Sequence, residues 1–176
     1  SQSIVGKGNV STSAVINTGG SDSVTGLTGS SNITSASVAI KWRGIENLWG
    51  NVYEWRDGIN FDDGLIYVCT NPSKYADDTA TNYTKLAYSK IQNNGYISSL
   101  GLDASIPWAQ IPTGIAGSDS TYLCDYYYSG SGWRVASVGG SWNDGSSAGL
   151  FFLGSDDGSS GSYSSIGSRL LILPKS

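Results

Sequence analysis

Carboxylates are the side chains of this sequence that could do acid–base chemistry, because histidine is absent from all 176 residues. Three adjacent pairs stand out, Asp62–Asp63, Asp77–Asp78 and Asp156–Asp157. Neighbouring aspartates are typical turn formers, and a glycosidase pair would need a separation set by the fold across a cleft. Without histidine, Ser-His-Asp and Cys-His sites are excluded. Calcium is not expected at these acidic pairs, because their spacing is not that of an EF-hand loop. We therefore expect no catalytic residues, no metal and no cofactor.

The two cysteines, Cys69 and Cys124, leave two interpretations open. One is a disulfide formed in an oxidising compartment. The other is a pair of buried free thiols that act as small hydrophobic side chains. We favour the thiols, because both cysteines follow aromatic, strand-like runs in which a small buried residue fits. Metal binding by these residues is not expected, since the sequence has no CxxC spacing.

Residues 139–173 combine large aromatic side chains with a background of small polar ones. Gly and Ser occupy 16 of the 28 positions from 141 to 168. Aromatic side chains offer large contact area at low entropic cost, while Ser, Asn and Asp supply adaptable hydrogen bonds, as in antibody loops. This composition predicts a ligand-binding surface with a few aromatic anchors. Its candidate contact residues are Ser137, Ser141, Trp142, Asn143, Asp144, Ser146, Ser147, Phe152, Ser155, Asp156, Asp157 and Tyr163.

Some positions of this segment have a second interpretation. Trp142 could equally be a core residue, and Leu150 and Phe151 are expected in the core. Ser159–Gly161 could be a loop tip that contacts nothing. Arg169 is expected to tie the end of the chain to the core through a carboxylate or a carbonyl oxygen.

Composition limits the classes to which the protein can belong. Hydrophobic residues make up 39% of the chain, which is enough for one domain with a core. The net charge is −4 and the ten basic residues form no run, so nucleic-acid binding is not expected. No stretch approaches the ~20 apolar residues of a membrane span. We therefore expect neither membrane insertion nor a nucleic-acid partner.

Several elements are predicted to position the surface. Residues 1–37 read as a Ser/Gly/Thr-rich arm or linker. Alternating side chains over 52–58, a turn at 62–64 and a returning strand over 65–70 indicate a hairpin. Helical structure is expected as a turn over 43–48 and as a helix within 73–95, where apolar residues recur at helical spacing. Further strands are expected at 122–124 and 166–173.

Four short motifs occur in a particular order: GNVYEW at 50–55, GWRV at 132–135, GGSW at 139–142 and IGSRL at 166–170. Together they resemble the C-type lectin fold of the formylglycine-generating-enzyme type. More narrowly, residues 38–173 resemble phage tail and receptor-binding proteins whose lectin-like domain is diversified by a diversity-generating retroelement. The resemblance implies an α+β class with a C-type-lectin-like fold, a twisted antiparallel sheet, few helices and long loops. It also implies one ligand-binding domain over 38–176, with a variable segment at about 137–168.

The same resemblance implies a function. The protein would be a phage or prophage tail protein, located on the virion or an extracellular surface. A homotrimer is common among such tail proteins, so oligomerisation is expected. The protein would recognise a bacterial surface protein or glycan without catalysis. Diversified codons of the Asn type cannot yield Lys, Glu, Gln, Met or Trp, and none of these occurs from 143 to 165. The first alternative is a structural virion or cell-surface domain without a diversified site. The second alternative, less favoured than the first, is a carboxylate-based hydrolase. Formylglycine-generating activity is rejected, because no cysteine follows Cys124.

Overall fold

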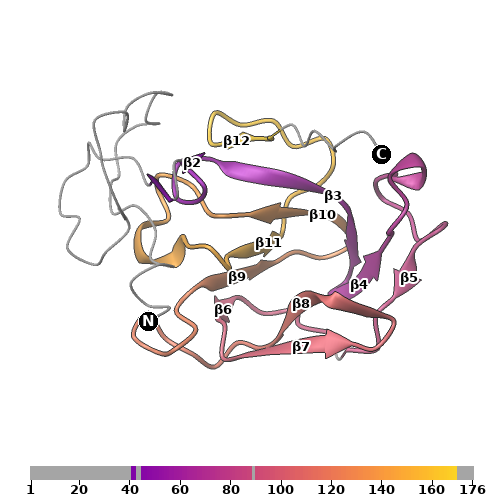
Figure 1. The fold of residues 1–176 in the computed structure, drawn as a ribbon, viewed down its shortest axis with the longest axis horizontal. Helices are drawn as coiled ribbons and strands as arrows, with labels where there is room; N and C mark the ends of the chain where they lie inside the picture. Colours follow the sequence, from indigo (N-terminus) through magenta and orange to yellow (C-terminus); the bar gives the residue numbers. More distant parts are fainter. Residues whose placement is uncertain (1–40, 43–44, 89, 170–176) are drawn as a thin grey trace.

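A mixed β-sheet of eight strands forms the frame of the molecule (Figure 1). The computed structural model describes residues 41–42, 45–88 and 90–169, so the predicted arm at 1–37 lies outside the described residues. The strands of this sheet are β3 (Tyr53–Asp62), β4 (Leu65–Val68), β5 (Thr84–Lys85), β6 (Gly95–Tyr96), β9 (Tyr126–Ser129), β10 (Trp133–Val138), β11 (Leu153–Ser155) and β12 (Ile166–Gly167).

The strand order is β5-β4-β3-β10-β11-β9-β6, and β12 pairs with β3. Two further pairs stand apart from this sheet. They are β1 (Lys41–Trp42) with β2 (Ile45–Glu46), and β7 (Ser99–Asp103) with β8 (Ile106–Gly114).

The predicted α+β class is wrong. The described residues contain no α-helix, only two short 3-10 turns, η1 (Pro72–Lys74) and η2 (Gly145–Ser147). The sheet is also not purely antiparallel, because β11 runs parallel to β9 and β12 runs parallel to β3. Within the described part of the chain, no helix is long and apolar enough to cross a membrane.

The helix predicted within 73–95 is absent for a local reason. Asp78 and Asn82 have positive φ angles of 54° and 68°, which a right-handed helix does not allow. The chain instead pairs briefly with β4 as β5 and buries Leu86 at the edge of the sheet. Its apolar spacing therefore reflects side chains that reach the core from an irregular segment.

The predicted hairpin is confirmed. β3 and β4 are antiparallel, with Phe61 opposite Ile66 and Asp62 opposite Leu65. The connection has two residues, Asp63 and Gly64, with φ angles of 47° and 78°. Positive φ at both central positions is typical of the type I′ turn that matches the twist of a hairpin.

Three smaller predictions differ from the structure. Of the helical turn expected over 43–48, residues 43–44 lie outside the described residues and 45–46 form strand β2 instead. Residues 122–124 are irregular, and the strand begins only at Tyr126. Of the buried strand expected over 166–173, residues 166–167 form β12 and are half-buried, 168–169 are exposed, and the rest lies outside the described residues.

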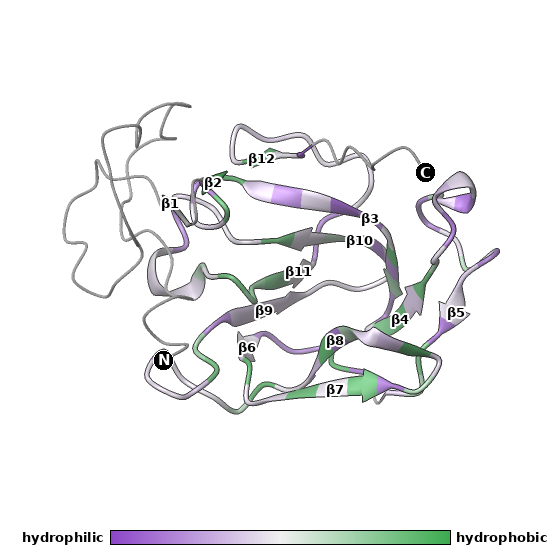
Figure 2. Cartoon of the chain, viewed as in Figure 1, coloured by the Kyte–Doolittle hydropathy of each residue, from purple (hydrophilic) through white to green (hydrophobic). Residues whose placement is uncertain are grey.

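The hydrophobic core lies between one face of the sheet and the β7–β8 hairpin, which carries much of the apolar colour in Figure 2. Tyr127, Ala136 and Leu153 contribute to it from three neighbouring strands. Ile106 and Ile111 contribute from β8. The two cysteines are buried thiols that are not joined in a disulfide, so the interpretation as buried thiols is confirmed.

Candidate functional site

The sheet face opposite the core carries a continuous row of aromatic rings. The strand register places Trp55, Ser137, Gly154 and Tyr128 side by side across four strands. Side chains alternate between the two faces of a strand, and the residues just before Ser137, Gly154 and Tyr128 belong to the core. These four residues therefore point to the opposite face, called here the outer face.

The aromatic row comprises Tyr53, Phe152, Tyr128, Tyr126 and Tyr96. Successive ring centroids lie 5.4, 5.7, 4.6 and 4.9 Å apart. The rings meet in tilted and edge-to-face arrangements, which aromatic pairs prefer. Phe152 is 1% exposed, while the four tyrosines are half-buried. The row is thus enclosed around Phe152 and reaches solvent on either side of it.

Two loops of the predicted variable segment adjoin this face. The first loop, residues 139–152, leads from β10 to β11 and contains η2. The second loop, residues 156–165, leads from β11 to β12. Both loops begin and end on strands of the same sheet, so the sheet fixes the positions of all four loop ends (Figure 1). The first loop joins the neighbouring strands β10 and β11, whereas the second crosses from β11 to β12, which pairs with β3.

The first loop is closed by a network around the carboxylate of Asp144. Its Oδ1 accepts a hydrogen bond of 2.8 Å from the Tyr53 hydroxyl. Its Oδ2 accepts the Ser141 N–H at 2.6 Å and the Ser141 hydroxyl at 3.0 Å. The Ser141 hydroxyl also contacts the side chain of Asn143. Both oxygens of Asp144 are therefore engaged within the protein.

The GGSW motif explains the sharp entry into this loop. Gly139 and Gly140 have φ angles of 86° and 71°, a region that favours glycine. A Cβ atom on Gly140 would lie 2.6 Å from the Cβ of Ala148. The Trp142 N–H donates to the carbonyl of Asn51 at 2.9 Å. The motif thus builds a tight turn that is bound to the chain just before β3.

The second loop is held at its ends and exposed between them. The Val135 N–H donates to the Asp157 carbonyl at 3.1 Å, and the Tyr53 N–H donates to the Ser165 carbonyl at 2.8 Å. Between these points the side chain of Tyr163 is 56% exposed. The Ser159 hydroxyl donates to Asp78 at 2.6 Å, so the predicted loop tip contacts a neighbouring loop.

The loop passes close to Trp55 at Gly161. A Cβ atom on Gly161 would lie 3.2 Å from the Tyr163 ring and 3.6 Å from the Trp55 ring. A half-buried tryptophan on β3 and an exposed tyrosine on the loop thus flank the same backbone position.

Four of the predicted contact residues lie inside the protein. Ser137, Ser141, Phe152 and Ser155 are each 0–1% exposed, and an enclosed side chain cannot touch a ligand outside. The Ser155 hydroxyl, for example, bonds the Tyr127 hydroxyl at 2.8 Å and the Tyr128 carbonyl at 3.0 Å. We therefore assign these four to the framework.

The remaining predicted residues divide into two groups. Asn143, Asp156 and Tyr163 are exposed. Half-buried positions are taken by Trp142, Asp144, Ser146, Ser147 and Asp157. The indole nitrogen of Trp142 is enclosed and, within the described residues, has no hydrogen-bond partner. The expectation that Leu150 and Phe151 belong to the core holds only in part, since both are half-buried.

Sequence reasoning missed the tyrosines that lie outside the segment. Tyr126 and Tyr128 share the outer face because they are two positions apart on β9, while Tyr127 between them enters the core. The tyrosine triplet at 126–128 carried this signal, since an alternating strand must divide it between two faces. Tyr53 gave no such signal, because its partner Asp144 is 91 positions away.

The charge around the outer face is negative. Segment 137–168 contains three aspartates and no lysine or arginine. Desolvation, and then the charges of Asp157 and Asp144, raise the pKa of Asp156 above its ordinary value, against the opposing effect of Arg134. Such a surface favours neutral or cationic ligands over anionic ones. Among the described residues, no three carboxylate or cysteine side chains gather in a way that could hold a metal ion.

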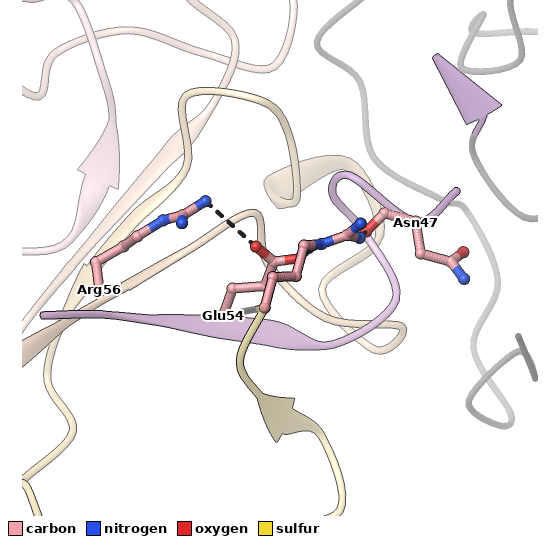
Figure 3. Close-up of polar contacts among 4 residues, drawn as sticks. Asn47, Glu54 and Arg56 are labelled. Atoms are coloured by element: carbon pink, nitrogen blue, oxygen red, sulfur yellow. Dashed lines mark hydrogen bonds and ion pairs between the residues drawn. The ribbon is translucent and has the colours of Figure 1, made fainter. Parts of the chain in front are cut away.

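A separate polar cluster joins the end of the described chain to β3. Glu54 is buried and forms ion pairs with Arg56, at 3.2 Å, and with Arg169 (Figure 3). Arg169 also donates to the carbonyl of Asn47. The structural role predicted for Arg169 is confirmed. A hollow of about 430 Å³ adjoins these residues, but both carboxylate oxygens of Glu54 are already paired with arginines.

Comparisons with protein-family models, with curated proteins and with solved structures find no match for this chain. The resemblance to diversified lectin-like proteins therefore stays a prediction from the sequence motifs.

Proposed function

We propose that this domain binds a ligand on a bacterial surface, as part of a phage or prophage tail protein, through the exposed residues of segment 137–168. The ligand would be a protein or a glycan, and binding would involve no catalysis. Several copies on one tail, for instance a homotrimer, would raise avidity beyond the affinity of each site.

The second loop carries this proposal. It presents an exposed aromatic ring, Tyr163, beside the half-buried Trp55, and it adds the carboxylate of Asp156 and several exposed serines. A rigid aromatic anchor surrounded by adaptable polar groups is the usual composition of a recognition loop. Because both ends of the loop are bonded to the sheet, its side chains can change without disturbing the core.

The test compares two tyrosines of similar exposure. Tyr163 lies in the second loop and is 56% exposed, whereas Tyr122 lies outside the segment and is 76% exposed. We would measure binding of the full chain and of each alanine variant to a panel of bacterial cells. Tyr163→Ala should weaken binding at least about tenfold, as expected for an interface anchor, and Tyr122→Ala should leave it unchanged.

Two results would contradict the proposal. One is equal binding by the unmodified chain and Tyr163→Ala across every strain bound. The other is an absence of binding to any strain, which would favour the structural alternative.

The neighbouring DNA offers an independent test. We expect there a near-copy of the coding sequence for 137–168 that differs mainly at adenines, together with a reverse-transcriptase gene.

A further inference from the structure

Two tyrosines outside the variable segment hold the first loop against the sheet. Tyr53 on β3 donates from its hydroxyl to Asp144 at 2.8 Å. Tyr96 on β6 has its hydroxyl 3.3 Å from that of Ser146. The two tyrosines are the ends of the aromatic row, so the loop is bonded to both ends of the same structure.

The two bonds differ in strength. The Tyr53 bond joins a hydroxyl to a charged acceptor, and bonds of this kind are roughly twice as strong as neutral ones. Burial, followed by the hydrogen bond to Asp144, raises the pKa of Tyr53 well above its ordinary value, so the hydroxyl keeps its proton and stays a donor. The Tyr96 bond is neutral and longer, and we expect it to contribute less.

The ring of Tyr53 connects the loop network to the enclosed part of the aromatic row. Tyr53 contacts Phe152 at a centroid distance of 5.4 Å, and Phe152 is 1% exposed. The carboxylate that accepts from Tyr53 also closes the Ser141 turn. Loss of Asp144 would therefore free the turn and remove the bond beside Phe152 in one step.

We propose that Tyr53 and Tyr96 are positioning residues for the first loop, and that the residues at 144 and 146 decide whether the loop is docked or released. With Asp144 and Ser146 the loop is docked and Phe152 is enclosed. With residues that cannot accept these bonds the loop is released and the aromatic row is exposed to ligand. The inference rests on the proposed function, because it supposes that positions 144 and 146 vary.

This assignment divides the segment by role. Changes at 144 and 146 would alter the shape of the surface, from a polar docked loop to an open aromatic row. Changes at exposed positions such as Asp156 and Tyr163 would alter only its chemistry. One frame could then present two kinds of binding surface without any change in its sheet.

Hydrogen exchange tests the docking directly and needs no ligand. Tyr53→Phe removes the hydroxyl but keeps the ring, so the amides of residues 142–150 should exchange about tenfold faster, as expected for the loss of one hydrogen bond to a charged acceptor. Asp144→Ala should give a larger acceleration, because it removes three bonds. Adding Tyr53→Phe to Asp144→Ala should then give little further change. Tyr163→Phe, which removes an exposed hydroxyl from the second loop, is the matched control.

A dye that becomes fluorescent on apolar surface provides the second measurement. Asp144→Ala should bind more dye than the unmodified chain, while the amides of β3 and β10 keep their protection. Unchanged exchange in Tyr53→Phe, or equal acceleration in Tyr163→Phe, would overturn the inference. If Tyr53→Phe does not fold, Tyr96→Phe decides the question, with an acceleration of about threefold expected from a weaker neutral bond and no acceleration counting against docking.

Failure of the two proposals can be told apart. If no bacterial surface is bound but Tyr53→Phe still accelerates exchange, the proposed function is wrong and the docking stands. If cells are bound through Tyr163 and exchange is unaffected by Tyr53→Phe, the function stands and the docking is wrong.

Discussion

The first and second loops have nearly the same composition and are built in opposite ways. Both consist mainly of Gly, Ser and Asp with a few aromatic residues. In the first loop, Ser141 is fully buried and both oxygens of Asp144 are bonded. In the second loop, the main-chain bonds to the sheet lie at the ends, and between them side chains such as Tyr163 remain exposed. Two loops of similar composition therefore differ in how many of their side chains are held by internal hydrogen bonds and how many stay exposed.

Replacement of Phe152 should produce the largest difference between the loops. Phe152 is enclosed between Tyr53 and Tyr128 at the end of the first loop. Phe152→Ala should lower the free energy of unfolding by about 3–5 kcal/mol, the usual cost of a buried phenylalanine. Urea denaturation would measure the change, with Tyr163→Ala as the comparison. A similar loss in both variants would show that the second loop is also framework.

The second largest effect concerns how the stability of the protein depends on pH, through a carboxylate that contacts the end of the first loop. Burial raises the pKa of Asp125 to about 7, against a bond from the Phe151 N–H at the end of the first loop. Because the folded pKa lies above the unfolded value, this group favours folding fully below about pH 4 and loses that contribution as the pH rises to about 7. The loss should be on the order of 4 kcal/mol.

Asp125→Asn supplies the control for this titration. The amide cannot ionise, so the part of the stability loss between pH 4 and pH 8 that comes from Asp125 should disappear. Thermal unfolding at several pH values would measure it. An identical pH profile in the variant would mean that other carboxylates, such as Asp156 in the second loop, cause the loss.

Removal of one carboxylate from each loop should produce a smaller difference in unfolding free energy between the two loops. Asp144→Ala leaves the Ser141 N–H and hydroxyl without their acceptor, and it should cost about 2 kcal/mol of unfolding free energy. Asp156→Ala removes an exposed side chain and should change stability by no more than about 0.5 kcal/mol. Equal effects, measured by urea denaturation, would contradict the distinction between a bonded and a free loop.

The smallest stability effect should belong to Tyr163. Because its side chain is 56% exposed, Tyr163→Ala should shift the unfolding free energy by less than about 0.5 kcal/mol, while its effect on ligand binding should be large. Thermal unfolding measured on the same variant as the cell-binding assay would show the small effect on stability beside the large effect on binding. A variant that is both unstable and unable to bind would place Tyr163 in the framework.

The sequence predicted those features that depend on neighbouring residues. The β3–β4 hairpin follows from alternation and an Asp-Gly turn. The binding segment at 137–168, which the resemblance implies, stays a prediction. Features that depend on distant partners were not predictable. Ser141 is enclosed because Asp144 and Asn51 surround it, and nothing in a serine-rich loop distinguishes it from an exposed serine such as Ser160.

The helix predicted within 73–95 failed for a related reason. Apolar spacing at 83, 86 and 91 fits a helical stripe, but it fits equally well a strand edge whose side chains reach one core. The positive φ angles at Asp78 and Asn82 are local preferences of Asp and Asn that outweigh this pattern. Two aspartates and an asparagine before an apolar residue indicate turns rather than a helix start.

The parallel pairing of β12 with β3 has a mechanical consequence. The chain enters β3 and leaves β12 in the same direction, with Ile166 beside Tyr53 and Gly167 beside Glu54. Tension applied through the two flanking segments would pull these strands in opposite senses along their length. Their backbone bonds and the Glu54–Arg169 pair would then be loaded together in shear rather than opened one after another.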